Sequence, residues 1–207
     1  MEWFNDGHAL QTTLHPSGTR IWAHNFNLER IFQDSVTWSD ITSGYLSVRF
    51  NGPGFLFDGS GTSAFFSDQD EKLTVLGLLN TTFMRDFSKV LNPTLHFQTG
   101  DFRNIPYKKT LRTKSFIKNV EAVVGISQKD WDSYETSWDF TTLPLLAARQ
   151  SGAPLAATYA ALRQQWQAAT LAMQRLEEEN NRLFIAAYGL QDELAPDVPL
   201  SEITLTC

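Results

Sequence analysis

The feature that most constrains the fold is an apolar repeat near the end of the chain. Counted from Leu155 in alternating steps of four and three residues, nine of the ten positions up to Ala187 are apolar or aromatic. This spacing is typical of a coiled coil or a long helix-hairpin seam, and it predicts a helix of about 45–50 Å. Asn180 is the polar member of the seam, a residue type that can fix register. Gly189 is the expected C-terminal stop.

A helix of this length cannot bury its apolar stripe alone. Two partners fit the pattern equally well. One is a helix from another chain or from sequence outside these 207 residues, and the other is the chain's own domain. Both alternatives are open at this point.

The first hundred residues have the character of β-structure. Short runs rich in β-branched and aromatic residues, Val36–Ile41, Gly44–Phe50 and Gly54–Phe57, are separated by Ser-Gly and Asn-Gly-Pro-Gly turns. Apolar and polar residues alternate from Leu46 to Phe50, which predicts a half-buried strand with Arg49 on its outer face.

Helical signals follow the strands. A cap at Ser67 or Asp68, followed by acids and then by apolar residues at helical spacing, predicts one helix that ends before Asn92. The chain after Pro93 is expected to be extended, with a turn at Thr99–Asp101. We therefore predict an α+β protein in three parts. These are a mixed-strand domain over residues 1–118, an irregular connector rich in tryptophan and acid over 119–154, and a long coiled-coil-like helix with a tail over 155–207.

Charge is unevenly distributed along the chain. The net charge of −6 argues against a general nucleic-acid binder, yet the stretch from Lys108 to Lys118 holds five basic residues and no acid. Its field is felt within about 10 Å at cellular salt. Phosphate contact and a merely solvated segment beside acidic neighbours are both consistent with this pattern.

The string "FDGSGTS", residues 57–63, spells like the glycine-rich turn with which many methyltransferases hold S-adenosylmethionine. Such a turn follows a buried strand, opens a helix at once, and is followed about 20 residues later by a strand ending in an acid. Here the preceding strand is short, the helix is delayed, and Leu78–Asn80 lies within a helix. The string Asn92-Pro93-Thr94-Leu95 also lacks the second proline and the aromatic of an adenine-methylation motif. We expect no cofactor-binding and no catalytic residue in this chain.

Other chemistries have less support. There is no P-loop, nucleophile elbow or zinc-protease motif in the sequence. We also predict no metal site, because no two of the four histidines have the close spacing of a ligand pair. These histidines are His8, His15, His24 and His96. The run Glu177–Glu179 is expected to be a solvated helix face. The acids between Asp130 and Asp139 lie among tryptophans, which favours a surface or interface role over catalysis.

The cellular location is indicated by features that the sequence lacks. Its single cysteine, Cys207, can form no internal disulfide. No apolar run approaches the roughly 20 residues that cross a bilayer, and the N-terminus is not a secretory signal. We expect a cytoplasmic protein with no membrane partner.

Four segments resemble one family. "VTWSDITSGYLSVRFNGPGFLFDGSGTSAFF" (36–66), "LGLLNTTFMRDFSKVLNPTLHFQTGDFRNIPY" (76–107), "ISQKDWDSYETSWDF" (126–140) and "NNRLFIAAYGLQDEL" (180–194) are similar to PglX-type adenine-specific DNA methyltransferases. These are large modification enzymes of BREX phage-defence systems. Residues 76–107 also resemble the target-recognition domains of TaqI-like and type I specificity proteins.

The resemblance implies that this chain is a C-terminal fragment whose natural start is not Met1. In the family, S-adenosylmethionine and the catalytic motifs belong to an upstream domain, so the fragment alone is expected to be inactive in adenine-N6 methylation. Residues 38–106 would be part of a target-recognition domain. The implied partners are double-stranded DNA, the missing N-terminal catalytic domain and other defence-system subunits. The alternative is a non-enzymatic interaction module that binds a partner protein through the helix at 155–187.

Within that resemblance, arginines suit guanine edges and lysines suit phosphates. Ser60 and Thr62 are expected to form the turn, with DNA contact as the alternative, and Arg49 has the alternative of an ordinary surface strand residue. Six basic residues are the candidate DNA contacts: Arg49, Arg103, Lys108, Lys109, Arg112 and Lys114.

Overall fold

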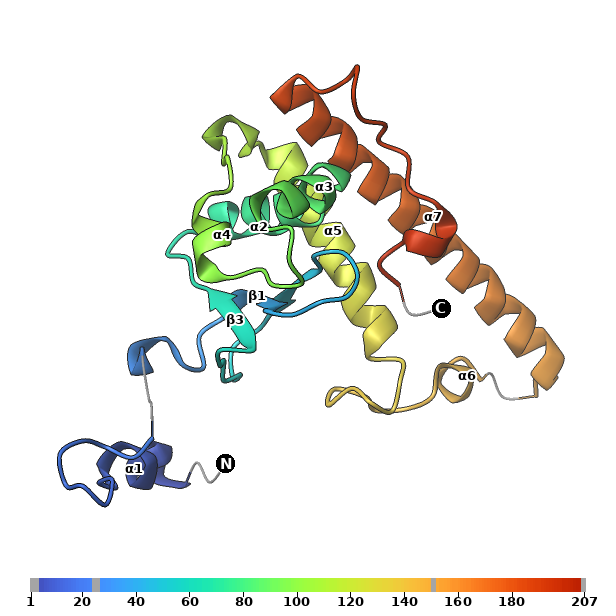
Figure 1. Ribbon diagram of the computed structural model, residues 1–207. Helices are drawn as coiled ribbons and strands as arrows, with labels where there is room; N and C mark the ends of the chain where they lie inside the picture. The colour runs from blue at the N-terminus through green and yellow to red at the C-terminus, as the bar shows by residue number, and fades with distance from the viewer. Residues whose placement is uncertain (1–3, 24–26, 150–151, 206–207) are drawn as a thin grey trace.

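A small antiparallel sheet and a group of helices share one hydrophobic core in the computed structural model, which describes residues 4–23, 27–149 and 152–205 (Figure 1). The predicted α+β class is confirmed. The core joins distant parts of the chain, since Val36 and Trp38 of the sheet, Leu78 and Phe116 of two central helices, and Phe184 of the long helix are all buried in it.

The sheet of the described residues has three strands, β1 (Ser35–Ser39), β2 (Val48–Asn51) and β3 (Gly61–Ala64), in the order β2-β1-β3. Both neighbouring pairs are antiparallel. The alternation predicted for β2 is confirmed, because Val48 is buried and Arg49 is exposed.

The prediction of a strand at Gly54–Phe57 is wrong. Phe55 and Leu56 are both more than two-fifths exposed, and the third strand begins only at Gly61. A run of apolar residues does not specify which strand it pairs with. Strand β3, which does pair with β1, has only small side chains.

A turn at Asp58 connects this loop to β3. The Asp58 Oδ1 accepts hydrogen bonds from the backbone N–H groups of Ser60 at 2.9 Å and Gly61 at 2.6 Å. A turn in the glycine-rich string is thereby confirmed, although Thr62 lies within the strand rather than in the turn. The string leads into a strand, and the next helix starts at Gln69.

Two helices, α2 (Gln69–Leu79) and α3 (Thr82–Leu91), stand where one was predicted. Asp68 caps α2 as expected, accepting the N–H of Glu71 at 2.8 Å. The predicted end before Asn92 is confirmed.

The break between α2 and α3 has a tertiary cause. The Asn80 side-chain amide donates to the carbonyl of Val48 at 2.9 Å, and its oxygen accepts the N–H of the same residue at 3.2 Å. Thr81 then caps the second helix by accepting the N–H of Met84 at 3.1 Å. The edge of the sheet therefore fixes Asn80 outside the helix, and a new cap follows at once.

Three helical elements follow: α4 (Thr99–Arg103), the 3-10 turn η2 (Lys109–Leu111) and α5 (Lys114–Trp131). Helix α4 corrects the expected extended segment, and the Asp101 carboxylate supports it by accepting the backbone N–H of the N-cap residue. Helix α5 contradicts the first part of the predicted irregular connector, because residues 119–131 belong to this helix. Residues 132–143 are irregular as predicted, and the short helix α6 (Pro144–Ala147) ends this part.

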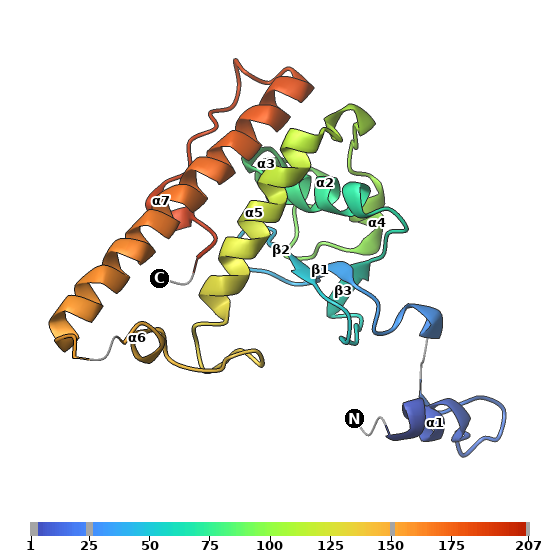
Figure 2. The ribbon, with the colours of Figure 1, turned by 180° about the vertical axis from the view of Figure 1, so that it is seen from behind.

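Helix α7 (Leu155–Tyr188) confirms the helix that the apolar repeat predicts, and Gly189 ends it in the left-handed region at φ 73°. Met173, Asn180 and Phe184 are buried in its second half. Figure 2 shows this half beside α3 and α5. The apolar stripe on the second half of α7 is therefore buried by the chain's own domain.

The first half of α7 differs from the second. Leu162 is buried, but Leu155, Tyr159 and Trp166 are 69%, 48% and 40% exposed. The stripe at this end is therefore only partly covered by the described residues, which leaves the alternative of an external partner open here.

The C-terminal tail turns back along α7 (Figure 1). The backbone N–H of Thr204 donates to Glu177 at 3.0 Å. Arg85 of α3 pairs at 2.6 Å with Glu202, which ends the 3-10 turn η3 (Leu200–Glu202). The tail thus ties together two helices that are distant in sequence.

This tail corrects the prediction that Glu177–Glu179 form a solvated face. Glu177 and Glu178 accept backbone N–H groups of the tail, the second from Val198 at 3.4 Å, and Glu179 pairs with Arg182. None of the three glutamates is fully exposed.

Burial raises the pKa of Glu177 above its usual value, and the hydrogen bonds from Thr204 offset part of that rise. Because the pKa is higher in the folded state, protonation of Glu177 adds to the free energy of unfolding. This contribution is complete below about pH 4.5 and is lost as the pH rises through the folded pKa. We expect Glu177→Gln, which keeps a carbonyl acceptor, to stabilise the protein at pH 8 by about 0.5 kcal/mol or less, and less at pH 4.5. Urea unfolding at the two pH values measures this.

Glu177→Ala is the control, since it removes the acceptor of the Thr204 N–H and should destabilise at both pH values. An equal effect of Glu177→Gln at the two pH values would contradict the expected pH dependence.

The N-terminal residues lie apart from the core in Figures 1 and 2. They form α1 (Phe4–Thr12) and a bridge between Leu14 and Ile21, and the 3-10 turn η1 (Leu28–Arg30) follows. None of the described helices has the length and apolar character needed to span a bilayer. Three residues that entered the sequence predictions lie outside the described part of the chain: Met1, His24 and Cys207.

Candidate nucleic-acid interface

The acid-free basic segment, Lys108–Lys118, spans η2 and the first turn of α5. Leu111 and Phe116 are buried and anchor it to the core, at 7% and 1% exposure. Thr113 caps α5 by accepting the N–H of Phe116 at 3.3 Å. These anchors fix the backbone, so the basic side chains between them start from defined positions.

Arg112 does not face solvent alone. Its Nη2 donates to both carboxylate oxygens of Asp68 at 2.8 Å, and Asp70 lies 4.0 Å away. The backbone N–H of Glu71, followed by the Arg112 guanidinium, lowers the pKa of Asp68 below its usual value. Arg112 therefore joins the start of α5 to the N-cap of α2.

Lys108 also has a structural partner. Its Nζ donates to the carbonyl of Ala187 at 2.7 Å and lies 4.7 Å from the ring centroid of Tyr188. A cation at the C-terminal end of a helix satisfies a terminal carbonyl and the negative end of the helix dipole. Lys108 therefore caps α7.

The other four candidates are exposed and form no ion pair with any described residue: Arg49, Arg103, Lys109 and Lys114. Lys109 and Lys114 lie on η2 and at the first position of α5, whereas Arg103 ends α4 and Arg49 projects from the sheet. The structure thus separates the six candidates into two that hold the fold and four that are available to a ligand.

Lys118 was not among the candidates. It is exposed and follows Lys114 by four residues on α5, so the two side chains share one helix face. Helical periodicity applied to the basic segment could have found it. Together with Lys109, they place three cations near the positive end of the α5 dipole.

Reactive groups are the other possible basis of a functional site. The described residues contain no cluster of three or more histidine, cysteine or acidic side chains suited to a metal ion. His96 pairs through Nδ1 with Asp40 at 3.0 Å, near the sheet rather than in a cavity of polar groups.

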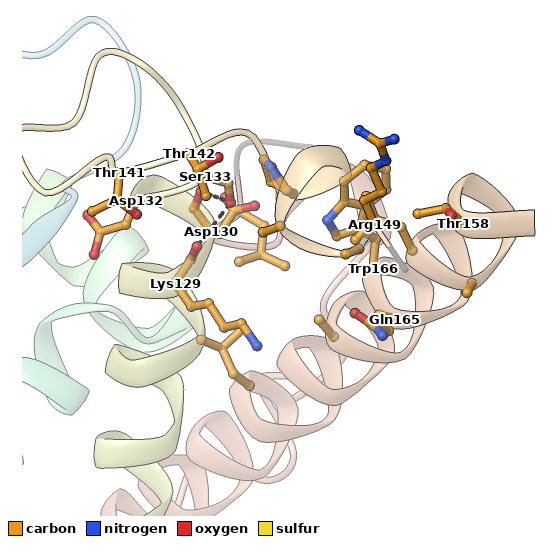
Figure 3. Close-up of a pocket in the computed structure, with 18 of the residues that line it drawn as sticks. Lys129, Asp130, Asp132, Ser133, Thr141, Thr142, Arg149, Thr158, Gln165 and Trp166 are labelled. Carbon is orange, nitrogen blue, oxygen red and sulfur yellow. Dashed lines mark hydrogen bonds between the residues drawn. The ribbon is translucent and has the colours of Figure 1, made fainter. Parts of the chain in front are cut away.

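A cleft of about 1150 Å³ lies between the end of α5, α6 and the first half of α7 (Figure 3). Its walls carry alanines beside Lys129, Arg149 and Trp166. Ser133 is not an activated nucleophile, because its hydroxyl donates to the carbonyls of the preceding turn. The geometry provides an open groove rather than a reactive centre.

Comparisons with known proteins identify the relatives of this chain. No known family model matches it. The adenine-specific methyltransferase PglX of Lacticaseibacillus casei (strain Zhang) is 37% identical over 204 residues, which is 95% of the chain. The chain is similar to a segment of PglX. The adenine-specific methyltransferase BrxX of Escherichia coli O9:H4 (strain HS) is 29% identical over 163 residues, or 76% of the chain.

The chain spans 17% of the length of that PglX and 13% of that BrxX. The match to PglX takes in almost the entire fold described above, including the sheet, the basic segment and α7. The resemblance read from the four sequence segments is confirmed as a PglX-type match.

Proposed function

We propose that this chain contributes DNA target recognition to a PglX-type adenine-specific methyltransferase. The observation that carries the proposal is similarity along 95% of the chain to a protein named as such a methyltransferase. An enzyme specific for adenine must find its base within DNA, and it does so through phosphate contacts that position it and base contacts that specify the site. The exposed cations near the start of α5 supply groups of this kind.

In this proposal residues 1–118 form the recognition unit, with 38–106 as its sequence-reading part. The connector at 119–154 and the helix and tail at 155–207 link it to the rest of the methyltransferase. The remainder of the enzyme supplies S-adenosylmethionine binding and adenine-N6 transfer. The assembly acts in the cytoplasm on double-stranded DNA as part of a phage-defence system with other subunits.

The exposed arginines and lysines suit different groups of the DNA. Arg49 and Arg103 carry planar guanidinium groups that suit guanine edges, while Lys109, Lys114 and Lys118 suit phosphates. Arg112 and Lys108 support this surface by fixing the basic segment to the N-cap of α2 and to the end of α7.

Charge reversal at Lys109 and Lys114 tests the proposal. We expect Lys109→Glu/Lys114→Glu to weaken binding to a fluorescein-labelled DNA duplex about tenfold or more at low salt. The slope of log affinity against log salt should fall by about 2, since each phosphate contact contributes about 0.9. Fluorescence anisotropy at several salt concentrations measures both.

Arg163→Glu/Arg175→Glu is the matched control, because it makes the same change in net charge on exposed arginines of α7. It should change affinity by no more than about twofold. If both double variants lose affinity equally, or neither does, these lysines do not contact DNA. Arg112 is unsuited to this test because its loss also breaks the contact with Asp68.

A second candidate function is a protein-interaction module that acts through α7. The exposure of Leu155, Tyr159 and Trp166 favours it. If the wild-type chain shows no salt-dependent DNA binding, while Tyr159→Ala/Trp166→Ala abolishes association with the remainder of a PglX-type enzyme, this second function replaces the first.

A further inference from the structure

An aromatic surface lies at the opposite end of α5 from the basic segment. Trp138 is 90% exposed, and Trp131, Phe55 and Tyr134 are 51%, 44% and 38% exposed. Large aromatic side chains normally bury most of their area, so several that stay exposed together mark an interaction surface. We call these four residues the aromatic patch.

The patch has a defined shape. Phe55 and Trp138 stack with ring centroids 6.1 Å apart and an interplanar angle of 25°, which joins the loop after β2 to the connector after α5. Within the connector the Asp132 carboxylate accepts the hydroxyl of Ser137 at 2.7 Å, and Ser137 is buried. An ordered connector thus carries the exposed Trp138, and Trp131 ends helix α5 just before it.

Acidic residues outnumber basic ones in the stretch that carries most of the patch. Residues 126–142 contain four acids and one base, Lys129: the acids are Asp130, Asp132, Glu135 and Asp139. Glu135 and Asp139 are exposed and form no ion pair with any described residue. The C-terminal end of α5, with its negative dipole end, lies at the same place.

This charge selects among the ligands that aromatic side chains can bind. Single-stranded nucleic acid stacks on aromatics only within a positive groove, and membrane surfaces that attract proteins are anionic. Both are repelled here. A cationic side chain interacts favourably with both the faces of the aromatic rings and the carboxylates. The planar guanidinium of arginine suits both kinds of contact.

We propose that the aromatic patch and its acids form a docking site for an arginine-rich segment of a partner protein. The 18 residues of α5 span about 27 Å, so this site is well separated from the basic segment at the other end of the helix. The two surfaces have opposite charge and take different classes of partner. The inference does not depend on DNA recognition.

The test follows the indole N–H signals of the six tryptophans by NMR while a nona-arginine peptide is added to the full chain. The signals of Trp131 and Trp138 should shift, and that of Trp22, which is 56% exposed in the N-terminal part, should not. Trp138→Ala should weaken peptide binding about fivefold, whereas Trp22→Ala leaves it unchanged.

The charge contribution is tested separately. Glu135→Gln/Asp139→Asn should weaken binding about fivefold at low salt, and Asp192→Asn/Glu193→Gln, the same change on exposed acids beyond α7, should not. Equal shifts at Trp22 and Trp138, equal effects of the two acid variants, or tighter binding of oligo-dT than of the peptide would each overturn the proposal.

Discussion

Replacing Phe184 by alanine is expected to lower the free energy of unfolding by about 3–5 kcal/mol. The side chain is fully buried and meets the ring of Phe116 edge-on, with ring centroids 5.2 Å apart. Its ring centroid lies 6.4 Å from that of Tyr188. It is the point at which α7 joins the core, so its loss leaves a cavity between α7 and α5. Equilibrium unfolding in urea, followed by far-UV circular dichroism, measures the change.

Tyr159→Ala is the matched control on the same helix. Its side chain is 48% exposed in the half of α7 that is only partly covered, so the free energy of unfolding should change by about 0.5 kcal/mol or less. A loss as large as that of Phe184→Ala would mean that the first half of α7 packs more tightly than the structure has it.

Gly77→Ala is expected to destabilise the protein by about 2–3 kcal/mol, although alanine is the better helix former. A Cβ at Gly77 would lie 2.6 Å from Phe116 Cζ, 2.8 Å from Val120 Cγ2 and 3.2 Å from Asn180 Oδ1. Those neighbours are buried and cannot move aside freely. The glycine lets α2 approach α5 and α7 closely, and its carbonyl accepts the Asn180 side-chain N–H at 2.9 Å.

Gly125→Ala is the control for this second change. Gly125 lies within α5, and nothing stands within 4 Å of an added Cβ. The substitution should stabilise by about 0.5–1 kcal/mol through helix propensity alone. If Gly77→Ala were also stabilising in the same urea experiment, the close contact of α2 with α5 would not exist in solution.

Much of the fold could be predicted because its signals are local. The cap at Asp68, the alternation around Val48, the apolar repeat of α7 and the stop at Gly189 each depend on residues of one continuous segment of the chain. These predictions are confirmed. Asn180 is the polar seam residue, and its partner proved to be Gly77 of the same chain.

The errors have tertiary causes. The predicted single helix is divided because Asn80 bonds to a strand 32 residues earlier in the chain. The solvated face at Glu177–Glu179 is covered by a tail whose return along α7 has no local signature. The strand predicted at Gly54–Phe57 failed because apolar character does not specify pairing.

The candidate site shows the same limit. Charge alone placed Lys108 and Arg112 beside Lys109 and Lys114 among the candidate DNA contacts. Their partners, Ala187 and Asp68, lie 79 and 44 residues away, so only the folded chain distinguishes a cation that caps a helix from one that faces solvent.

The side chain of Asn80 also has a consequence for self-association. By donating to and accepting from the backbone of Val48, it takes the place that a further strand would occupy beside β2. A sheet edge with free N–H and C=O groups can recruit strands of other molecules and begin aggregation. At this position the edge is already satisfied by a side chain, and a neighbouring molecule finds no backbone partner there.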